Sequence, residues 1–238
     1  MNHKGKWYIF CILTCITILS IAQICSNVVT TMTERAPFER RHTIIIDAGH
    51  GGEDGGALSA DGIPESEYNL AIALRLEKLM HLLGYETRMV RNFDVSVYKS
   101  GTSLAQKKRS DLKERVNLVN QTKNGLLLSI HQNSYPDSRY YGAQVFYAKT
   151  EGSKALAEEM QHLFQKTVNK GSNREIKPAN GIYLMEHIQQ PGILIECGFL
   201  SNPGEARKLM DNQYQKKVVS VIAVSVNNYL KNTEKAYT

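Results

Sequence analysis

The sequence predicts an α/β protein with three layers, a mainly parallel twisted sheet flanked by helices on both faces. Two observations support this class. Short, wholly apolar runs alternate with longer segments of helical periodicity, and such runs are typical of strands buried on both faces. The chain has 238 residues and 42% hydrophobic content, which suffices for one sizeable core. We therefore expect a single domain behind a short leader.

The first half of the domain alternates between strand and helix. Thr43–Asp47 is a β-branched run that ends at a glycine cluster, and it is predicted to be a buried strand. Apolar residues recur at helical spacing over Asn69–Leu83, and Gly84 supplies the stop. Tyr85–Val90 is predicted to be a second strand.

The polar stretch 93–109 is predicted to be a surface loop, because it contains a glycine and a basic cluster. Asp111–Gln121 should follow as a helix with Asp111 as its N-cap. The remaining predicted strands are Leu126–Ile130, Ala143–Tyr147, a short Ile182–Met185 and Ile193–Ile195, and the remaining predicted helices are Ser153–Asn169 and Gln213–Leu230.

The N-terminus carries the features of an export signal. Lys4 and Lys6 precede an uncharged apolar run, 7–24, which is near the lower length for a spanning helix. Residues 1–25 are therefore predicted to be a signal peptide or an N-terminal membrane anchor, and cleavage and retention both stay open. Residues 26–41 are polar and without period, so they are predicted to be a linker to a catalytic domain at 42–232. Ile24 disfavours lipidation of Cys25.

Charge and cysteine content narrow the partners. The net charge of +6 favours anionic partners, but the basic residues are scattered and no nucleic-acid-binding motif is present. Nucleic acid is therefore not expected as a partner, whereas anionic wall polymers remain. Cys197 is the one cysteine of the predicted domain, so no disulfide is expected within it.

Polar residues gather where the predicted strands end. In a mainly parallel sheet the site lies at the carboxyl ends of the strands. His50 follows the first strand, His131 follows the third, and Glu196 follows the strand at Ile193–Ile195. A carboxylate directly after an apolar strand is costly to bury unless it is paired, hydrogen-bonded or near a metal.

These residue types indicate a metal-dependent hydrolase. Two histidines and a glutamate, with a fourth position for water, are the ligands of a catalytic zinc site. The third ligand is predicted to be Glu65, in the loop after the first strand, and Glu67 is its rival. Glu196 is then predicted to be the base that accepts the proton of the attacking water. Asn133 is expected either to orient substrate or a ligand, or to cap a loop. Arg115 is expected to be a solvated residue or a carboxylate clamp.

Four motifs in one order resemble the zinc-dependent N-acetylmuramoyl-L-alanine amidase family of wall hydrolases. They are IIIDAGHGGEDGG, Glu65 before Asn69-Leu70, SIHQN, and ILIECGFLSNP. The resemblance implies that His50, Glu65 and His131 bind Zn²⁺, that Glu196 is catalytic, and that the substrate is the amide between N-acetylmuramic acid and L-alanine of peptidoglycan.

The chain also resembles the germination-specific members of this family in endospore formers. The features that it shares with them are the segments RSDLKERV and GIYLMEHIQQPG and the short length. That resemblance implies a role in making muramic δ-lactam in the spore cortex. It also implies a functional link to a muramic acid deacetylase, an accessory lipoprotein as a candidate partner, and a location outside the cytoplasmic membrane in the forespore intermembrane space or cortex. A vegetative or sporulation autolysin of the same family is the alternative.

Two other classes of protein compete with this interpretation. A cysteine hydrolase would use Cys197 as nucleophile and His131 as base, but Glu196 and Cys197 are neighbours on a strand and should point to opposite sides. Cys197 is instead expected to pack in the core. A wall-binding module without activity would lack a ligand or the base, and all four are present. The glycine loop lacks the Lys-Ser/Thr ending of a P-loop, which argues against nucleotide binding.

Overall fold

This computed structural model describes residue 23 and residues 42–236. The described part contains a six-stranded sheet. The strands lie in the order β2-β1-β3-β6-β4-β5, and every neighbouring pair is parallel except β4 and β6, which are antiparallel. The predicted mainly parallel α/β class is confirmed. The strands are β1 (Thr43–Ala48), β2 (Glu86–Met89), β3 (Gly125–Asn133), β4 (Gln144–Tyr147), β5 (Lys177–Pro178) and β6 (Gly192–Phe199).

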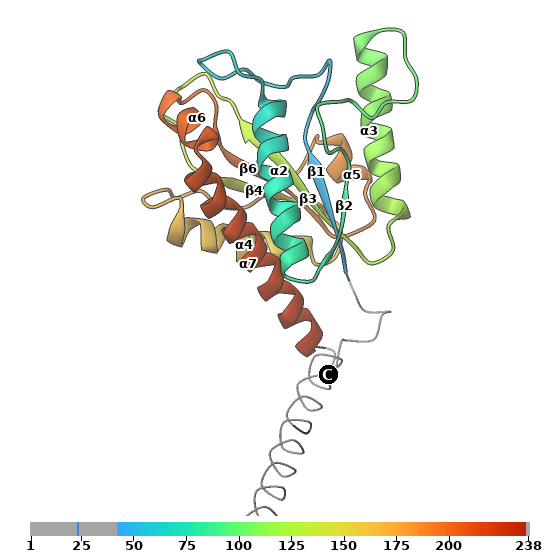
Figure 1. Cartoon of the computed structure of the whole chain (residues 1–238), viewed down its shortest axis with the longest axis vertical. Helices are drawn as coiled ribbons and strands as arrows, with labels where there is room; N and C mark the ends of the chain where they lie inside the picture. Colours follow the sequence, from blue (N-terminus) through green and yellow to red (C-terminus); the bar gives the residue numbers. More distant parts are fainter. Residues whose placement is uncertain (1–22, 24–41, 237–238) are drawn as a thin grey trace, which may run out of the picture. The chain divides into compact units, whose positions relative to one another are not determined.

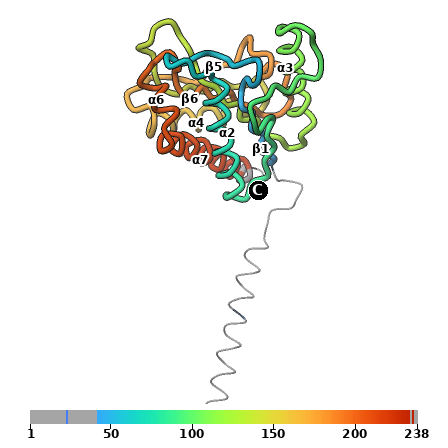
Figure 2. Tube along the Cα trace, turned by 45° about the horizontal axis from the view of Figure 1, so that its top comes forward, coloured from blue at the N-terminus to red at the C-terminus, as the bar shows by residue number. Residues whose placement is uncertain are grey.

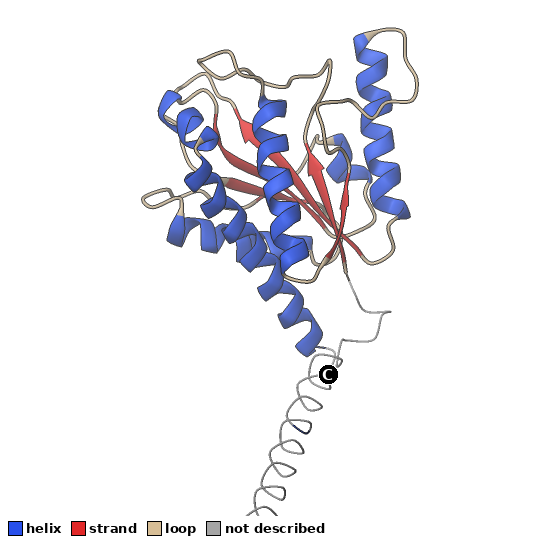
Figure 3. Cartoon of the chain, in the orientation of Figure 1, coloured by secondary structure: helices blue, strands red, loops and turns tan. Residues whose placement is uncertain are grey.

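Helices cover both faces of this sheet (Figures 1 and 3). One face is covered by α2 (Glu65–Leu82), α4 (Ser153–Thr167) and α7 (Asn212–Ala236), and the other by α3 (Leu104–Gln121) and α5 (Tyr183–His187). α7 packs against both α2 and α4 and also against the short α6 (Pro203–Met210), as Figure 2 shows from a second side.

The middle of each central strand is mostly apolar, because its side chains meet one of two cores. Ile44 and Ile46 of β1 belong to the larger core under α2, α4 and α7, whereas Ile45 between them belongs to the smaller core under α3 and α5. All three isoleucines are fully buried. The alternation of a strand therefore places its side chains in opposite layers, which explains why a continuous apolar run was needed.

α3 begins seven residues before its predicted start. Ser103 caps it by accepting a hydrogen bond from the backbone N–H of Gln106, whose side chain accepts one from the Ser103 backbone N–H, so the two residues form a capping box. The prediction that Asp111 is an N-cap was wrong, because Asp111 lies inside the helix. Its carboxylate instead accepts a hydrogen bond from the backbone N–H of Val97, at 2.7 Å.

The predicted strand at Ile182–Met185 was also wrong, since Tyr183–His187 forms the short helix α5. Four apolar residues in a row do not distinguish a strand from one buried turn of helix. α6 and β5 were not predicted. Asn202 caps α6 and Pro203 begins it, and both are start signals that were present in the sequence.

The leader and linker predicted at 1–25 and 26–41 lie outside the described residues, apart from residue 23. Among the described residues, no helix combines the length and the apolar character needed to cross a membrane.

Candidate metal centre

His50 lies on the loop that leaves β1. Its backbone adopts a left-handed conformation (φ 62°), which is uncommon for a residue other than glycine. Its Nδ1 lies 2.9 Å from Oδ2 of Asp54 and its Nε2 lies 3.2 Å from Oε2 of Glu65. Asp54 thus orients the ring from behind, as second carboxylates do for metal-ligating histidines.

Glu65 is the first residue of α2, rather than a loop residue before the helix as predicted. It is 4% exposed, and three donors fix its carboxylate. Oε1 accepts hydrogen bonds from Asn69 Nδ2 and from the backbone N–H of Gln132, both at 3.1 Å. Oε2 accepts one from the backbone N–H of Ala57 at 3.2 Å.

His131 lies within β3, which runs two residues beyond it, rather than after the strand end as predicted. Its Nδ1 lies 2.9 Å from Oε1 of Glu65, and its ring centroid lies 5.0 Å from that of His50. One nitrogen of each histidine and one oxygen of Glu65 all lie within 4.8 Å of one another. The structure therefore brings together all three predicted ligands.

The electrostatics of this cluster favour a cation. Burial alone would raise the pKa of Glu65, but the hydrogen bonds and charges of His131 and His50 hold it far below its usual range. Burial lowers the pKa of His50, yet Glu65 and Asp54 outweigh that effect and raise it overall. An ionised carboxylate is thus flanked by two imidazoles.

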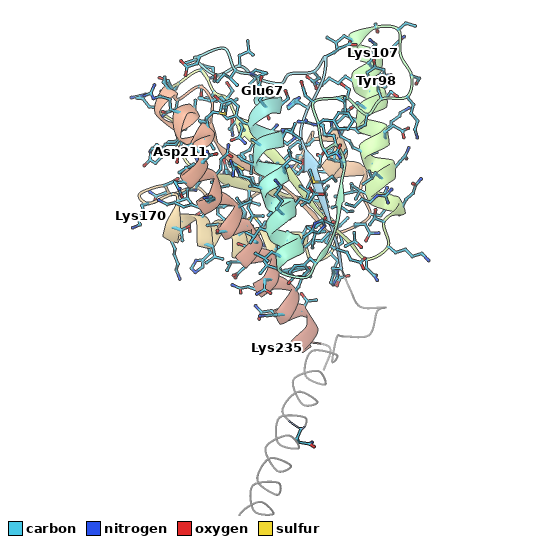
Figure 4. The ribbon with its side chains drawn as sticks, in the orientation of Figure 1. Glu67, Tyr98, Lys107, Lys170, Asp211 and Lys235 are labelled. Atoms are coloured by element: carbon cyan, nitrogen blue, oxygen red, sulfur yellow. The ribbon has the colours of Figure 1, made fainter. Side chains whose placement is uncertain are left out.

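The three side chains fit a zinc ion. Two imidazole nitrogens and a carboxylate oxygen are ligands that zinc prefers, and a fourth position stays free for water. Glu67, the rival ligand, lies on the exposed side of the first turn of α2 (Figure 4), whereas Glu65 is buried. Gly56 also serves the site, because a Cβ there would lie 2.6 Å from Oε2 of Glu65 and 2.8 Å from the ring of His50.

Glu196 lies inside β6 rather than after its end, and it pairs with His131 across the ladder between β3 and β6. Paired residues of neighbouring strands point to the same face, so the Glu196 carboxyl lies beside the ligand cluster. Among the described residues, its Oε2 is buried without a hydrogen-bond partner. Burial, reinforced by the charge of Glu65, raises the pKa of Glu196 to about 7, although the two histidines oppose that shift.

Cys197, next to Glu196, points into the larger core and is fully buried, as expected. Burial raises the pKa of its thiol well above the usual range, and the charge of Glu196 adds to this shift. A thiol in this position is neither accessible nor ionised, which argues against a cysteine nucleophile. Asn133 ends β3, and its carbonyl accepts a hydrogen bond from the backbone N–H of Leu200 at 2.8 Å.

Two buried arginines hold the His50 loop. Arg115 of α3 is 3% exposed and forms an ion pair with Asp47 of β1. It also donates Nε to Asp111 at 2.6 Å and Nη2 to the carbonyl of His50 at 2.8 Å. Of the two alternatives for Arg115, the structure shows the carboxylate clamp.

Arg91 follows β2 and was not singled out from the sequence. Its Nη2 donates to the carbonyls of Gly49, at 3.0 Å, and Ser66, at 2.9 Å. It thereby ties the loop that carries His50 to the start of α2, which carries Glu65. A basic residue just after a strand was the available signal.

α3 braces the same loop from outside through its first turns. Lys107 donates to Glu53 at 2.6 Å and Lys108 lies 3.2 Å from Oδ2 of Asp54. The Lys107 ammonium also lies over the ring of Tyr98, 5.2 Å from its centroid, and Figure 4 shows the two side by side.

An α/β sheet with histidines and carboxylates converging at one edge has the arrangement of a hydrolase active site. The family model for N-acetylmuramoyl-L-alanine amidase matches residues 44–228, and the chain belongs to this family of peptidoglycan hydrolases. The resemblance seen in the sequence is confirmed.

Several known proteins are similar to the chain. The germination-specific N-acetylmuramoyl-L-alanine amidase of Bacillus subtilis is 37% identical over 194 residues, which cover 81% of this chain and 80% of that protein. The CwlD amidase of Clostridioides difficile, solved in complex with the GerS lipoprotein, is 41% identical with a TM-score of 0.76, over 79% of this chain and 98% of that one. An N-acetylmuramoyl-L-alanine amidase of Clostridium difficile 630 is 31% identical with a TM-score of 0.70, over 81% and 98%.

Proposed function

We propose that this enzyme hydrolyses the amide between N-acetylmuramic acid and L-alanine with Zn²⁺ held by His50, Glu65 and His131 and with Glu196 as general base. The observation that carries the proposal is the pairing of Glu196 with His131, which sets an unpartnered carboxyl oxygen beside the three converging ligand atoms. Unpartnered buried carboxyls are rare, and they cluster at functional sites.

The residues divide the reaction between them. Zinc, when bound, supplies a Lewis acid that polarises the scissile carbonyl and lowers the pKa of water. Glu196 accepts a proton as the water oxygen attacks the carbonyl carbon. It then donates that proton to the L-alanine nitrogen as the C–N bond breaks, leaving a lactyl carboxylic acid and a free amine; the acid then loses its proton and the amine gains one, which gives a carboxylate and an ammonium group. Asp54 keeps the His50 ring in its orientation through the 2.9 Å contact at Nδ1.

The spore role is the finer part of the proposal. It is supported by similarity to a relative named for germination and to an amidase solved with a lipoprotein. The enzyme then removes stem peptides so that a muramic acid deacetylase and ring closure produce muramic δ-lactam in the cortex, with a lipoprotein as accessory partner. Residues 1–25 direct the domain across the cytoplasmic membrane, as a cleaved signal or as an anchor in contact with the membrane, and residues 26–41 link it to the domain at 42–232.

The chemistry is tested on peptidoglycan with the purified full-length protein. We expect new L-alanine amino termini, which disappear on treatment with a chelator and return when zinc is added back. His50→Ala should lower bound zinc, whereas Glu67→Gln, a control on the exposed side of α2, should not. Activity that survives complete removal of metal would refute the zinc mechanism.

The spore role is tested separately, in an endospore-forming host. Spores that lack the enzyme should contain no muramic δ-lactam, and the wild-type chain should restore it while Glu196→Gln should not. Normal δ-lactam in the deleted strain would favour the alternative, a vegetative or sporulation autolysin.

A further inference from the structure

A cleft of about 630 Å³ opens between the loop after β3 and the segment before β5. It is lined by aromatic and basic side chains, among them Tyr140, Tyr141 and Arg174. Tyr140 and Tyr141 are each 44% exposed. Exposed aromatic residues grouped around a concavity are typical of binding sites, and the mechanism above uses none of these residues.

One residue, Gln144, lies between the cleft and Glu196. Gln144 lines the cleft and pairs with Glu196 across the antiparallel ladder between β4 and β6. Directly paired residues have Cβ atoms only about 5 Å apart on the same face of a sheet. Gln144 is buried, and its Oε1 accepts a hydrogen bond from Nη1 of Arg174 at 2.9 Å. The Arg174 guanidinium is therefore one side chain away from Glu196.

The orientation of the Arg174 side chain is fixed by its neighbours, and one of its N–H groups remains available as a hydrogen-bond donor. Its Nε donates to the carbonyl of Tyr141 at 2.8 Å. The guanidinium carbon lies 4.3 Å from the ring centroid of Phe199 and 5.5 Å from that of Tyr140. Among the described residues, its Nη2 has no hydrogen-bond partner. A guanidinium whose orientation is fixed by stacking and two hydrogen bonds is prepared to bind a carboxylate at low entropic cost.

Among the described residues, no carboxylate forms an ion pair with Arg174, although the charge of Glu205 acts on it and Glu175 also lines the cleft. Asp137 is bound on both oxygens by Arg139, with Nη2 to Oδ2 at 2.8 Å. Glu205 uses Oε2 to accept backbone hydrogen bonds from Gly142 at 2.7 Å and Phe199 at 3.0 Å. The cleft thus presents one oriented positive charge without a carboxylate bound to it.

We propose that this cleft binds the stem peptide of the substrate and that Arg174 recognises a carboxylate which that peptide carries. The inference rests on the proposed function, because it takes the scissile amide to lie at Glu196 and the metal ligands. An acidic peptide that leaves this point along β4 would reach Arg174 directly past Gln144. Arg174 is thereby a specificity-determining residue, and Tyr140 and Phe199 hold its plane.

The test compares an N-acetylmuramoyl peptide with an acidic second residue and the same compound with its carboxylates amidated. We expect Arg174→Gln to raise KM for the acidic compound by about 10- to 100-fold, the range for a hydrogen bond to a charged group, with kcat nearly unchanged. KM for the amidated compound should stay the same. Arg139→Gln, the control for charge at the cleft, should leave both KM values within twofold, since its partner Asp137 already binds it and its side chain is 89% exposed.

Calorimetric binding of the two compounds to the metal-free full-length protein separates this inference from the function on which it rests. A wild-type preference for the acidic compound that Arg174→Gln abolishes supports the cleft, even if no turnover is seen. Turnover with equal affinity for both compounds, in wild type and Arg174→Gln alike, overturns the inference and leaves the amidase function standing. Unchanged circular dichroism and zinc content of Arg174→Gln exclude a folding defect.

Discussion

Replacing Arg115 by methionine should destabilise the protein severely, although Arg115 touches no substrate. Its removal leaves Asp47, which is 1% exposed, with the hydroxyl of Ser129 at 2.7 Å as its remaining side-chain partner. Breaking a buried ion pair on one side costs about 3–5 kcal/mol, because a charge stays buried without compensation. The loss of the bond to the His50 carbonyl should in addition weaken metal binding.

Urea denaturation measures this cost, as a lower midpoint at an unchanged m-value. Arg139→Met is the matched control, because its surface pair with Asp137 should contribute less than about 1 kcal/mol. Asp47→Asn combined with Arg115→Met should be less destabilised than the sum of the two single variants, since the stranded charge is gone. A loss below about 1 kcal/mol for Arg115→Met alone would refute the reasoning, given the 3–5 kcal/mol expected of a broken buried pair.

The pH dependence of the same pair has a definite sign. Burial would raise the pKa of Asp47, but Arg115 and the Ser129 hydroxyl hold it below its usual value. The stabilisation is therefore complete above the pKa that Asp47 has in the unfolded chain, and it is lost as the pH falls through the lower pKa of the folded protein. The stability gap between wild type and Arg115→Met should consequently narrow in acid.

Three further predictions concern the reaction centre. Glu196→Gln should lower kcat by about 10²- to 10⁴-fold with zinc content unchanged. The kcat/KM of the wild type should fall as the pH is lowered, because the proposed base must be deprotonated to act. The same fall of kcat/KM at low pH in Glu196→Gln would contradict this. Gly56→Ala should weaken zinc affinity by at least roughly tenfold in a competition titration, because the new Cβ would overlap Glu65 and Gly56 has a φ of 73°. Gly62→Ala is the control and should leave zinc affinity unchanged, because a Cβ at Gly62 would meet no atom. Cys197→Ala should keep full turnover and lose stability on the order of 1 kcal/mol, and abolished turnover would reinstate a cysteine mechanism.

The parts of the fold that were predictable are those in which one signal dominates. β1, β3 and β6 each contain a continuous apolar run, at 44–46, 126–128 and 193–195, and Thr43, Leu126 and Ile193 all lie in strands as expected. The start of α3 was missed because residues 104–110 are mostly polar, and the capping box at Ser103 was a more reliable signal than apolar period. For α5 the sequence was ambiguous, since four apolar residues fit either element.

The candidate site was predictable to a different extent for each residue. His50, His131 and Glu196 could be predicted because they lie near the carboxyl ends of the predicted strands, and in the structure they lie close together at that end of the sheet. Glu65 depended on resemblance to a family, because nothing local separates it from Glu67 except burial at the start of α2. Arg91 was not found, because its role consists of hydrogen bonds to backbone carbonyls far along the chain, and its signal, a basic residue just after a strand, does not reveal those partners.

The pairing of His131 with Glu196 has a consequence for how this enzyme could diversify. The two residues lie on neighbouring central strands, so the spacing between the proposed ligand and the proposed base is set by backbone hydrogen bonds. A one-residue slip would send either side chain to the opposite face. The cleft around Arg174 is instead built largely by connecting segments, which tolerate insertion and exchange. Substrate preference could therefore be rebuilt by grafting loops, while the bond that is cut stays the same.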